Sequence, residues 1–381
     1  MTGTVLTARA AGRATLARQH LLERHAGGAL EEIAHLAGMQ AQAPLAPYTG
    51  LWARLHGFTH DELSALYHRR QVVRIALMRG TIHLVACQDA LAWRPLVDPV
   101  IARATQAAFG RHYRDLDQDT LAEAARELTE TAPRTFAQLG ALLEQRFPGR
   151  DPAALAQAAR ARLPLVQIPP RGVWRAGGAI AHTTTRAWLG RDPVDKPDVE
   201  AMVRRYLAAF GPAGVMDAQA WSGLTRLREV FDRLRPHLAV LRGESGAELF
   251  DLPEAPRPDP DTPAPARFLP EYDNLLFSHA ERGRVNPHGR GVPLFPGNGS
   301  ALGYILLDGV YAGLWRAQRP GGAAGRGAPA RAGGAQRALL TIRHFGALPA
   351  GGREQLTGEG LRLLGFLAPQ ATPEIAFAPA T

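Results

Sequence analysis

The sequence predicts an α+β fold with three tandem modules, each a set of helices followed by a β-hairpin, and a C-terminal β-rich portion. Helical patterns followed by paired strand patterns recur three times, at a spacing of roughly 80 residues. An Asp-Gly pair between alternating strands marks a further hairpin near the C-terminus. Since helices followed by a hairpin make a winged helix, we expect winged helices over 1–118, 119–197 and 198–262, and a β-rich region over 263–381.

The first module contains four helical patterns and one hairpin. Thr59 precedes a short helix, with Glu62 three residues later as in a capping box. The residues from Val72 to Val85 are rich in β-branched side chains and predict two strands hinged near Arg79 and Gly80. The other three helices are expected over 8–25, 30–39 and 48–55.

The second and third modules repeat this order without detectable identity. Asp151 followed by Pro152 marks a helix start, because these are the preferred N-cap and first helical residues. Helices are expected over 120–130, 136–147 and from 152 in the second module, and over 199–210, 217–224 and 225–234 in the third. Hairpins are expected over 165–182, around Pro169 to Gly172, and over 238–252, around Gly243 to Gly246.

The C-terminal region is predicted to be mostly strand. The residues from Gly303 to Trp315 alternate around the Asp308-Gly309 turn. The Gly, Ala and Arg tract over 319–337 cannot bury a core and predicts a disordered loop. A strand over 339–345 and an amphipathic helix over 353–366 follow.

Composition restricts the chemistry. The net charge of +9 indicates a polyanionic partner. Cys87 is the single cysteine, which excludes an internal disulfide and a thiolate zinc site, and no histidine spacing predicts a metal. Lys196 is the single lysine and the sole candidate for Schiff-base chemistry. Without a signal peptide or an apolar span, we expect a cytoplasmic monomer that needs no cofactor.

The segment from Gly38 to Pro44 carries two neutral amides, Gln40 and Gln42. Pro44 and Pro47 follow and disfavour a helix through the segment. Side chains alternate in an extended chain, so Gln40 and Gln42 are expected to point the same way and share a target. A polar turn between helices is the alternative interpretation.

Candidate DNA contacts lie on the predicted hairpins. Arg79 and His83 are expected to share one face of a strand, although a solvated face of the wing explains them equally well. The second hairpin has a basic tip with an aromatic residue, which suits entry into a minor groove. Its end carries hydroxyls and an arginine, which a strand end capping the next segment also explains. The candidates on this hairpin are Arg171, Trp174, Arg175, His182, Thr183 and Arg186.

Other polar and aromatic residues near the motif have a structural explanation. Tyr48 and Trp52 are expected in the core. Glu271 and Asp273 alternate in the run Leu269-Pro270-Glu271-Tyr272-Asp273-Asn274, and we expect them to hold arginines.

Three segments together resemble the winged-helix DNA glycosylases of the AlkZ and YcaQ type. They are Met39-Gln40-Ala41-Gln42-Ala43-Pro44, Met78-Arg79-Gly80-Thr81-Ile82-His83-Leu84-Val85 and the run that begins at Leu269. The resemblance covers about 15–366. It implies tandem winged helices around a concave DNA channel, and excision of N7-alkylated purines, including those in interstrand crosslinks. The Gln-x-Gln form resembles the AlkZ branch, associated with self-resistance to DNA-alkylating natural products.

The chemistry agrees with this resemblance. Glycosidic hydrolysis usually needs a carboxylate and an acid that protonates the leaving group. A purine alkylated at N7 is already cationic, so Gln40 and Gln42 need only hold a water beneath C1′. Lys196 lies in a proline-rich loop, far in sequence from Gln40, so we expect a monofunctional enzyme without lyase activity. The alternative is a non-catalytic winged-helix regulator that binds double-stranded DNA.

Overall fold

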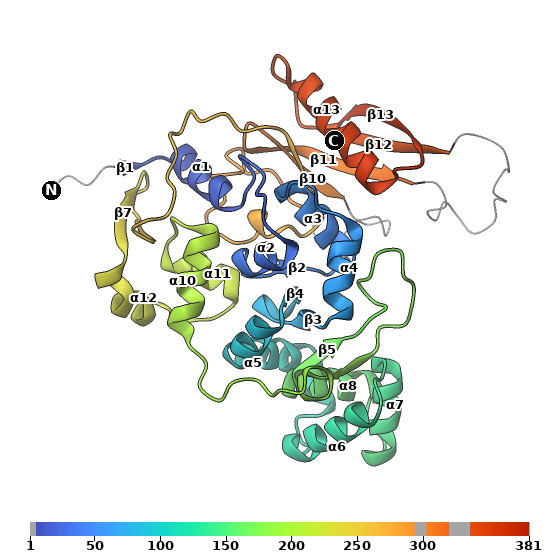
Figure 1. The fold of residues 1–381 in the computed structure, drawn as a ribbon. Helices are drawn as coiled ribbons and strands as arrows, with labels where there is room; N and C mark the ends of the chain where they lie inside the picture. Colours follow the sequence, from blue (N-terminus) through green and yellow to red (C-terminus); the bar gives the residue numbers. More distant parts are fainter. Residues whose placement is uncertain (1–4, 294–301, 320–335, 381) are drawn as a thin grey trace.

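The computed structural model describes residues 5–293, 302–319 and 336–380. Helices and strands are mixed along this part of the chain, as expected for an α+β protein (Figure 1). The α-helices are α1 (Ala8–Arg18), α2 (Ala29–His35), α3 (Ala46–Arg54), α4 (His60–His68), α5 (Cys87–Phe109), α6 (Gln118–Thr131), α7 (Phe136–Arg146), α8 (Pro152–Arg162), α9 (Thr185–Leu189), α10 (Val199–Phe210), α11 (Val215–Ser222), α12 (Arg228–Leu234) and α13 (Gly352–Leu367). The strands are β1 (Val5–Leu6), β2 (Met39–Gln40), β3 (Val72–Ala76), β4 (Ile82–Ala86), β5 (Leu165–Gln167), β6 (His182–Thr184), β7 (Ala239–Gly243), β8 (Glu248–Asp251), β9 (Arg267–Leu269), β10 (Gly303–Leu307), β11 (Val310–Gln318), β12 (Arg337–His344) and β13 (Thr372–Pro379).

Helix starts agree with the capping signals in the sequence. Thr59 accepts from the backbone N–H of Glu62 at the start of α4, and Asp151 caps α8 with Pro152 as its first residue. The 23-residue helix α5 was not predicted, and Pro95 and Pro99 lie inside it. Prolines remove backbone donors and usually end a helix, so this helix depends on tertiary packing.

One five-stranded sheet joins the first two predicted modules. Its order is β2-β4-β3-β5-β6, and β3 pairs antiparallel with β5 through Ile75 and Val166. The hairpin over 72–85 is confirmed. The predicted strand from Val173 to Ala181 is wrong: the segment forms no strand, and pairing with β5 begins only at His182.

The other two sheets contain the first and the last strand of the described chain, β1 and β13. The hairpin of β7 and β8 is confirmed, and β1 adds a parallel edge to it. The C-terminal sheet has the order β13-β12-β11-β10-β9 and turns at Asp308 and Gly309, both with positive φ, as predicted. Strand β13 was not predicted. Of the predicted loop 319–337, residues 320–335 lie outside the described part.

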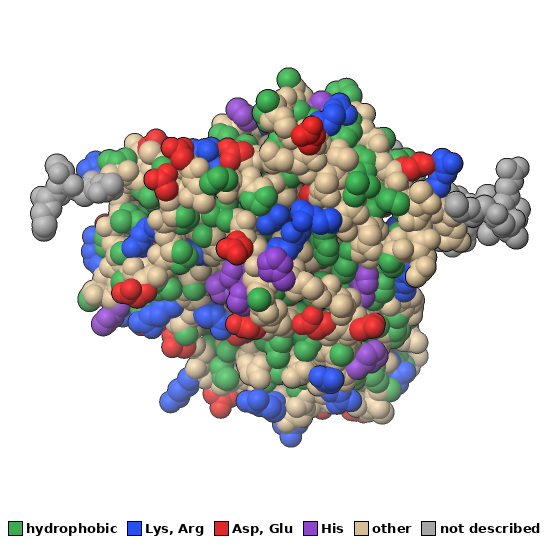
Figure 2. Space-filling model, turned by 45° about the horizontal axis from the view of Figure 1, so that its top comes forward, with side chains coloured by type: hydrophobic (Ala, Val, Ile, Leu, Met, Phe, Trp, Pro, Cys, Tyr) green, Lys and Arg blue, Asp and Glu red, His purple; other side chains and the backbone are tan. Residues whose placement is uncertain are grey.

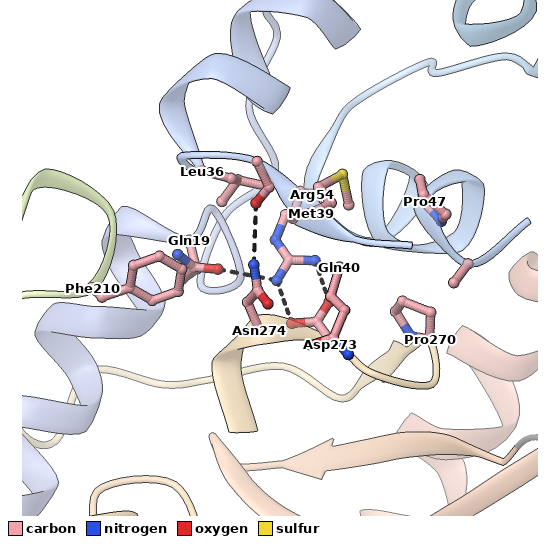
Figure 3. A pocket seen from close by; sticks show the side chains of 12 residues that line it. Gln19, Leu36, Met39, Gln40, Pro47, Arg54, Phe210, Pro270, Asp273 and Asn274 are labelled. Carbon is pink, nitrogen blue, oxygen red and sulfur yellow. Dashed lines mark hydrogen bonds and ion pairs between the residues drawn. The ribbon is translucent and has the colours of Figure 1, made fainter. Parts of the chain in front are cut away.

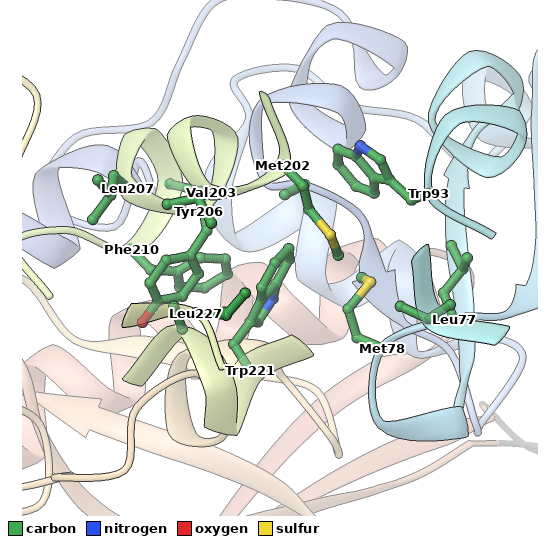
Figure 4. Packing of buried hydrophobic residues seen from close by; sticks show 14 of the residues in the cluster. Leu77, Met78, Trp93, Met202, Val203, Tyr206, Leu207, Phe210, Trp221 and Leu227 are labelled. Atoms are coloured by element: carbon green, nitrogen blue, oxygen red, sulfur yellow. The ribbon is translucent and has the colours of Figure 1, made fainter. Parts of the chain in front are cut away.

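The largest cluster of buried hydrophobic residues connects the β2-β4-β3-β5-β6 sheet with the third predicted module, over 198–262. Met78 and Trp93 pack near Met202, Tyr206 and Trp221 in this cluster (Figure 4). Helices α6, α7 and α8 form a separate bundle at the end of the molecule opposite α13 (Figure 1). Met78, in the turn between β3 and β4, therefore packs against residues of α10 and α11. The same turn extends to the candidate site.

Candidate active site

The candidate site begins where α2 turns into β2. Gly38 has a φ of 86°, and a side chain there would meet Cγ1 of Val85 at 2.4 Å. A left-handed glycine commonly ends a helix because it carries no Cβ. The chain then pairs with β4, which places Gln40 opposite His83 at the sheet edge.

Gln40 and Gln42 are both tethered through their amide oxygens. The Arg79 guanidinium donates to Oε1 of Gln40 at 2.7 Å, and the backbone N–H of Ile82 donates to Oε1 of Gln42 at 3.0 Å. The strand itself ends at Gln40, so Gln42 lies in the following turn and not in a longer extended segment. One short segment, 79–82, thus holds both amides.

Arg79 lies in the turn between β3 and β4, so its predicted place on one strand with His83 is wrong. The turn Met78–Gly80 is a single 3₁₀ turn in which Arg79 has a φ of 56°. The guanidinium also donates to the backbone oxygen of Trp221 at 2.5 Å. Burial lowers the pKa of Arg79 to about 10, which leaves the side chain charged at neutral pH.

A small pocket beside Gln40 has a rigid wall built from distant segments (Figure 3). Arg54 donates to both carboxylate oxygens of Asp273, at 2.8 and 2.9 Å, and also to Oε1 of Gln19 at 3.1 Å. Asn274 donates to the backbone oxygen of Gly38 at 3.2 Å. The expectation that Asp273 holds an arginine is confirmed, and the carboxylate is therefore not free to act as a base.

His83 is buried beside Gln40. Its Nδ1 lies 3.0 Å from the backbone oxygen of Thr81, and its Nε2 has no hydrogen-bond partner among the described residues. Burial and the nearby Arg79 lower the pKa of His83 to about 3, so the ring is neutral. With 0% exposure, it is out of reach of a DNA phosphate in this conformation.

The segment with Arg171, Trp174 and Arg175 folds back on the first module. Trp174 stacks on His60, with ring centroids 3.7 Å apart, and meets the ring of the fully buried Tyr48 at 5.0 Å. Arg171 is half-buried, and burial lowers its pKa. Arg175 is exposed. The aromatic residue of the predicted wing tip is thus packed against protein, whereas Arg175 is available to a phosphate.

His182 and Thr183 are buried, and their neighbour Arg186 is exposed. The His182 ring stacks on Phe136 at 4.0 Å, and burial lowers its pKa to about 4. The Thr183 hydroxyl donates to the backbone oxygen of Thr129 at 2.9 Å. In this conformation Arg186 is the only one of these three that a DNA backbone can reach.

Basic and acidic side chains are interspersed on one face of the protein. Figure 2 shows Lys and Arg side chains near the middle of one face and along its lower edge, with acidic side chains between them. No helix in the described ranges is long and apolar enough to cross a membrane.

Known proteins confirm the family suggested by the three segments. A solved structure, the DNA glycosylase AlkZ of Streptomyces sahachiroi, has a similar fold with a TM-score of 0.72 and 18% identity. The match covers 98% of this chain and all of that chain. No curated protein matches the sequence. A family model described as DNA glycosylase AlkZ-like matches residues 33–366, and the chain therefore belongs to the AlkZ-like DNA glycosylases.

Proposed function

We propose that the protein is a monofunctional glycosylase that hydrolyses the N-glycosidic bond of N7-alkylated purines in double-stranded DNA. The observation that carries this proposal is the pair of tethered, uncharged amides at Gln40 and Gln42. Asp273, the carboxylate in the pocket that Gln40 lines, is neutralised by Arg54. Asp273 is therefore not available to protonate a leaving group, and a substrate that carries its own positive charge does not need an acid.

The hydrogen bonds to Gln40 and Gln42 determine what each amide oxygen can do. An amide oxygen has two lone pairs, so Gln40 and Gln42 each keep one for a water after accepting from Arg79 and Ile82. Amides held in advance lose little freedom when the water binds. The water then attacks C1′ as the cationic purine leaves with the electrons of the glycosidic bond and becomes a neutral base. The attacking water releases one proton to solvent, and the products are the free base and an abasic site.

We assign the three helix-and-hairpin units, over 1–118, 119–197 and 198–262, as winged helices that line a concave DNA channel. An open channel suits bulky adducts and interstrand crosslinks better than an enclosing pocket. Self-resistance to a DNA-alkylating natural product is the biological role that we propose, based on the Gln-x-Gln form of the motif.

The test is release of 7-methylguanine from a duplex that contains one N7-methylguanine. Wild type releases the base, and Gln40→Ala and Gln42→Ala each slow single-turnover release by about 100-fold, as for loss of one positioned polar group. DNA affinity, measured in parallel, stays unchanged. If wild type releases no base from methylated or crosslinked duplex, the enzymatic proposal fails.

A second measurement tests the water mechanism. Lys196, the single lysine, is exposed in the loop before α10 and does not line the pocket with Gln40. Borohydride therefore traps no covalent protein–DNA adduct during turnover. A trapped adduct would show an amine nucleophile and overturn the water mechanism.

A further inference from the structure

A second pocket lies next to the one that contains Gln40. Ala46, the first residue of α3, borders both pockets. Pro270 borders the first, and its neighbour Glu271 borders the second. The second pocket has a volume of about 280 Å³, just below the range of about 300 to 1,000 Å³ for small-molecule sites. Because its lining adjoins that of the pocket with Gln40, the second pocket suits a part of the same substrate.

Trp174 presents one ring face to this second pocket. Its other face stacks on His60, which stacks in turn on Phe366 at 4.0 Å. His60 does not border the pocket, whereas Arg319 does, with its guanidinium carbon 5.4 Å from the Trp174 centroid. The planar guanidinium of Arg319 therefore lies on the pocket side of the Trp174 ring. A cation in this position is attracted by the aromatic face.

Glu271 supplies an acceptor in the same pocket. Its carboxylate is half-buried and accepts no side-chain hydrogen bond from the rest of the described chain. Burial raises its pKa, whereas a hydrogen bond from its own backbone N–H and the positive charge of Arg319 oppose that shift. A partly desolvated carboxylate that has only its own backbone as a donor gains most from a ligand that brings both N–H groups and positive charge.

We propose that Trp174 and Glu271 form a binding site for the flipped, cationic base of an N7-alkylguanine that is not crosslinked to the other strand, and that this base displaces Arg319 from the ring. This proposal rests on the glycosylase function proposed above. The base would stack on the free face of Trp174, while Glu271 accepts hydrogen bonds from the N1–H and 2-amino groups. Adenine has an acceptor at N1, so the carboxylate favours guanine. The positive charge distinguishes the alkylated base from normal guanine.

Nucleoside binding to the full chain tests this site directly. Tryptophan fluorescence is titrated with 7-methylguanosine and with guanosine at neutral pH, where part of the methylated nucleoside is cationic and Glu271 keeps more of its charge than in acid. We expect wild type to bind 7-methylguanosine about tenfold more tightly or better, equal to about 1.4 kcal/mol. Glu271→Gln and Trp174→Leu abolish this preference. Equal affinity of wild type for the two nucleosides, or a preference that survives both substitutions, overturns the proposal.

Arg319→Gln gives a test whose expected result, tighter binding, cannot arise from misfolding. Removing the guanidinium that occupies Trp174 is expected to tighten 7-methylguanosine binding severalfold. Arg343→Gln, on β12 and outside the pocket, removes the same charge and serves as the matched control with unchanged affinity. Unchanged or weaker binding by Arg319→Gln contradicts the displacement of Arg319.

The two proposals fail separately. Gln40→Ala is expected to keep nucleoside binding while it loses base release. If wild type binds 7-methylguanosine selectively but releases no base from DNA, the glycosylase proposal fails and the binding site stands. If wild type releases the base but shows no preference between the nucleosides, the binding site fails and the glycosylase proposal stands.

Discussion

At the scale of single residues, Gln40 depends on one guanidinium. Arg79 joins Oε1 of Gln40 to the backbone oxygen of Trp221, and its left-handed backbone is held by the turn around it. A non-glycine residue in that conformation is uncommon and persists where its surroundings require it. We therefore interpret Arg79 as a positioning residue that acts through Gln40.

Arg79→Lys tests this role while keeping the charge. A lysine ammonium lacks the planar fork, so it cannot hold Gln40 and Trp221 in the same geometry. Single-turnover base release is expected to fall about tenfold or more, with the DNA dissociation constant within about twofold of wild type. Arg343→Lys on β12 is the control. Weakened DNA binding with normal release would instead make Arg79 a phosphate contact.

The residues of the site differ in how far the sequence predicts them. Gln40 and Gln42 stand out because two amides alternate before a proline. Asp273 was expected to hold an arginine, but its partner Arg54 was not identified. The contacts of Gln19 and Asn274 were not predicted either. Gln19 meets Arg54 across 35 positions and Asn274 meets Gly38 across 236, and such separations carry no local spacing signal.

At the scale of elements, local signals succeeded and long-range pairing did not. Caps and turns, such as Asp151 before α8 and the Asp308-Gly309 turn, depend on neighbouring residues and were predicted. Strand β13 and the joining of β3 to β5 depend on distant partners. Helix α5 was not predicted because its two prolines indicate a helix end, whereas tertiary packing keeps the helix continuous.

The pairing of β3 with β5 predicts that the first two modules unfold together. Ile75 and Val166 face each other across this junction, and both are fully buried. Val166→Ala leaves a cavity there and is expected to lower the free energy of unfolding by about 2 kcal/mol. Urea unfolding followed by fluorescence and by circular dichroism should give coincident transitions in both proteins. Two separate transitions in wild type would show that the modules unfold independently.

At the scale of the whole molecule, several buried histidines are kept neutral. Burial lowers the pKa of His83 and His279 to about 3 and that of His182 to about 4. The unfolded chain, with ordinary histidine pKa values near 6.5, takes up protons first as the pH falls. Stability is therefore complete above about pH 6.5 and is lost progressively as the pH falls toward 4.

Urea titrations at fixed pH check this expectation. Between pH 6.5 and pH 4.5 the free energy of unfolding is expected to fall by about 3 kcal/mol or more, since each buried histidine contributes up to about 1.4 kcal/mol per pH unit. His182→Gln should reduce the slope, and His237→Gln, at an exposed position, should not. A free energy that is constant over this range would contradict the neutral, buried state.

The contact between Arg54 and Asp273 has a consequence for the nascent chain. Gln40 leaves the ribosome early in synthesis, but the wall behind it is supplied by Asp273 and Asn274, more than 200 residues later. Until that segment emerges, Arg54 has no carboxylate partner and Gly38 lacks the donor from Asn274. A growing chain in which the segment of Gln40 and Gln42 has already folded therefore has an incomplete site. Base excision requires that most of the protein has been synthesised.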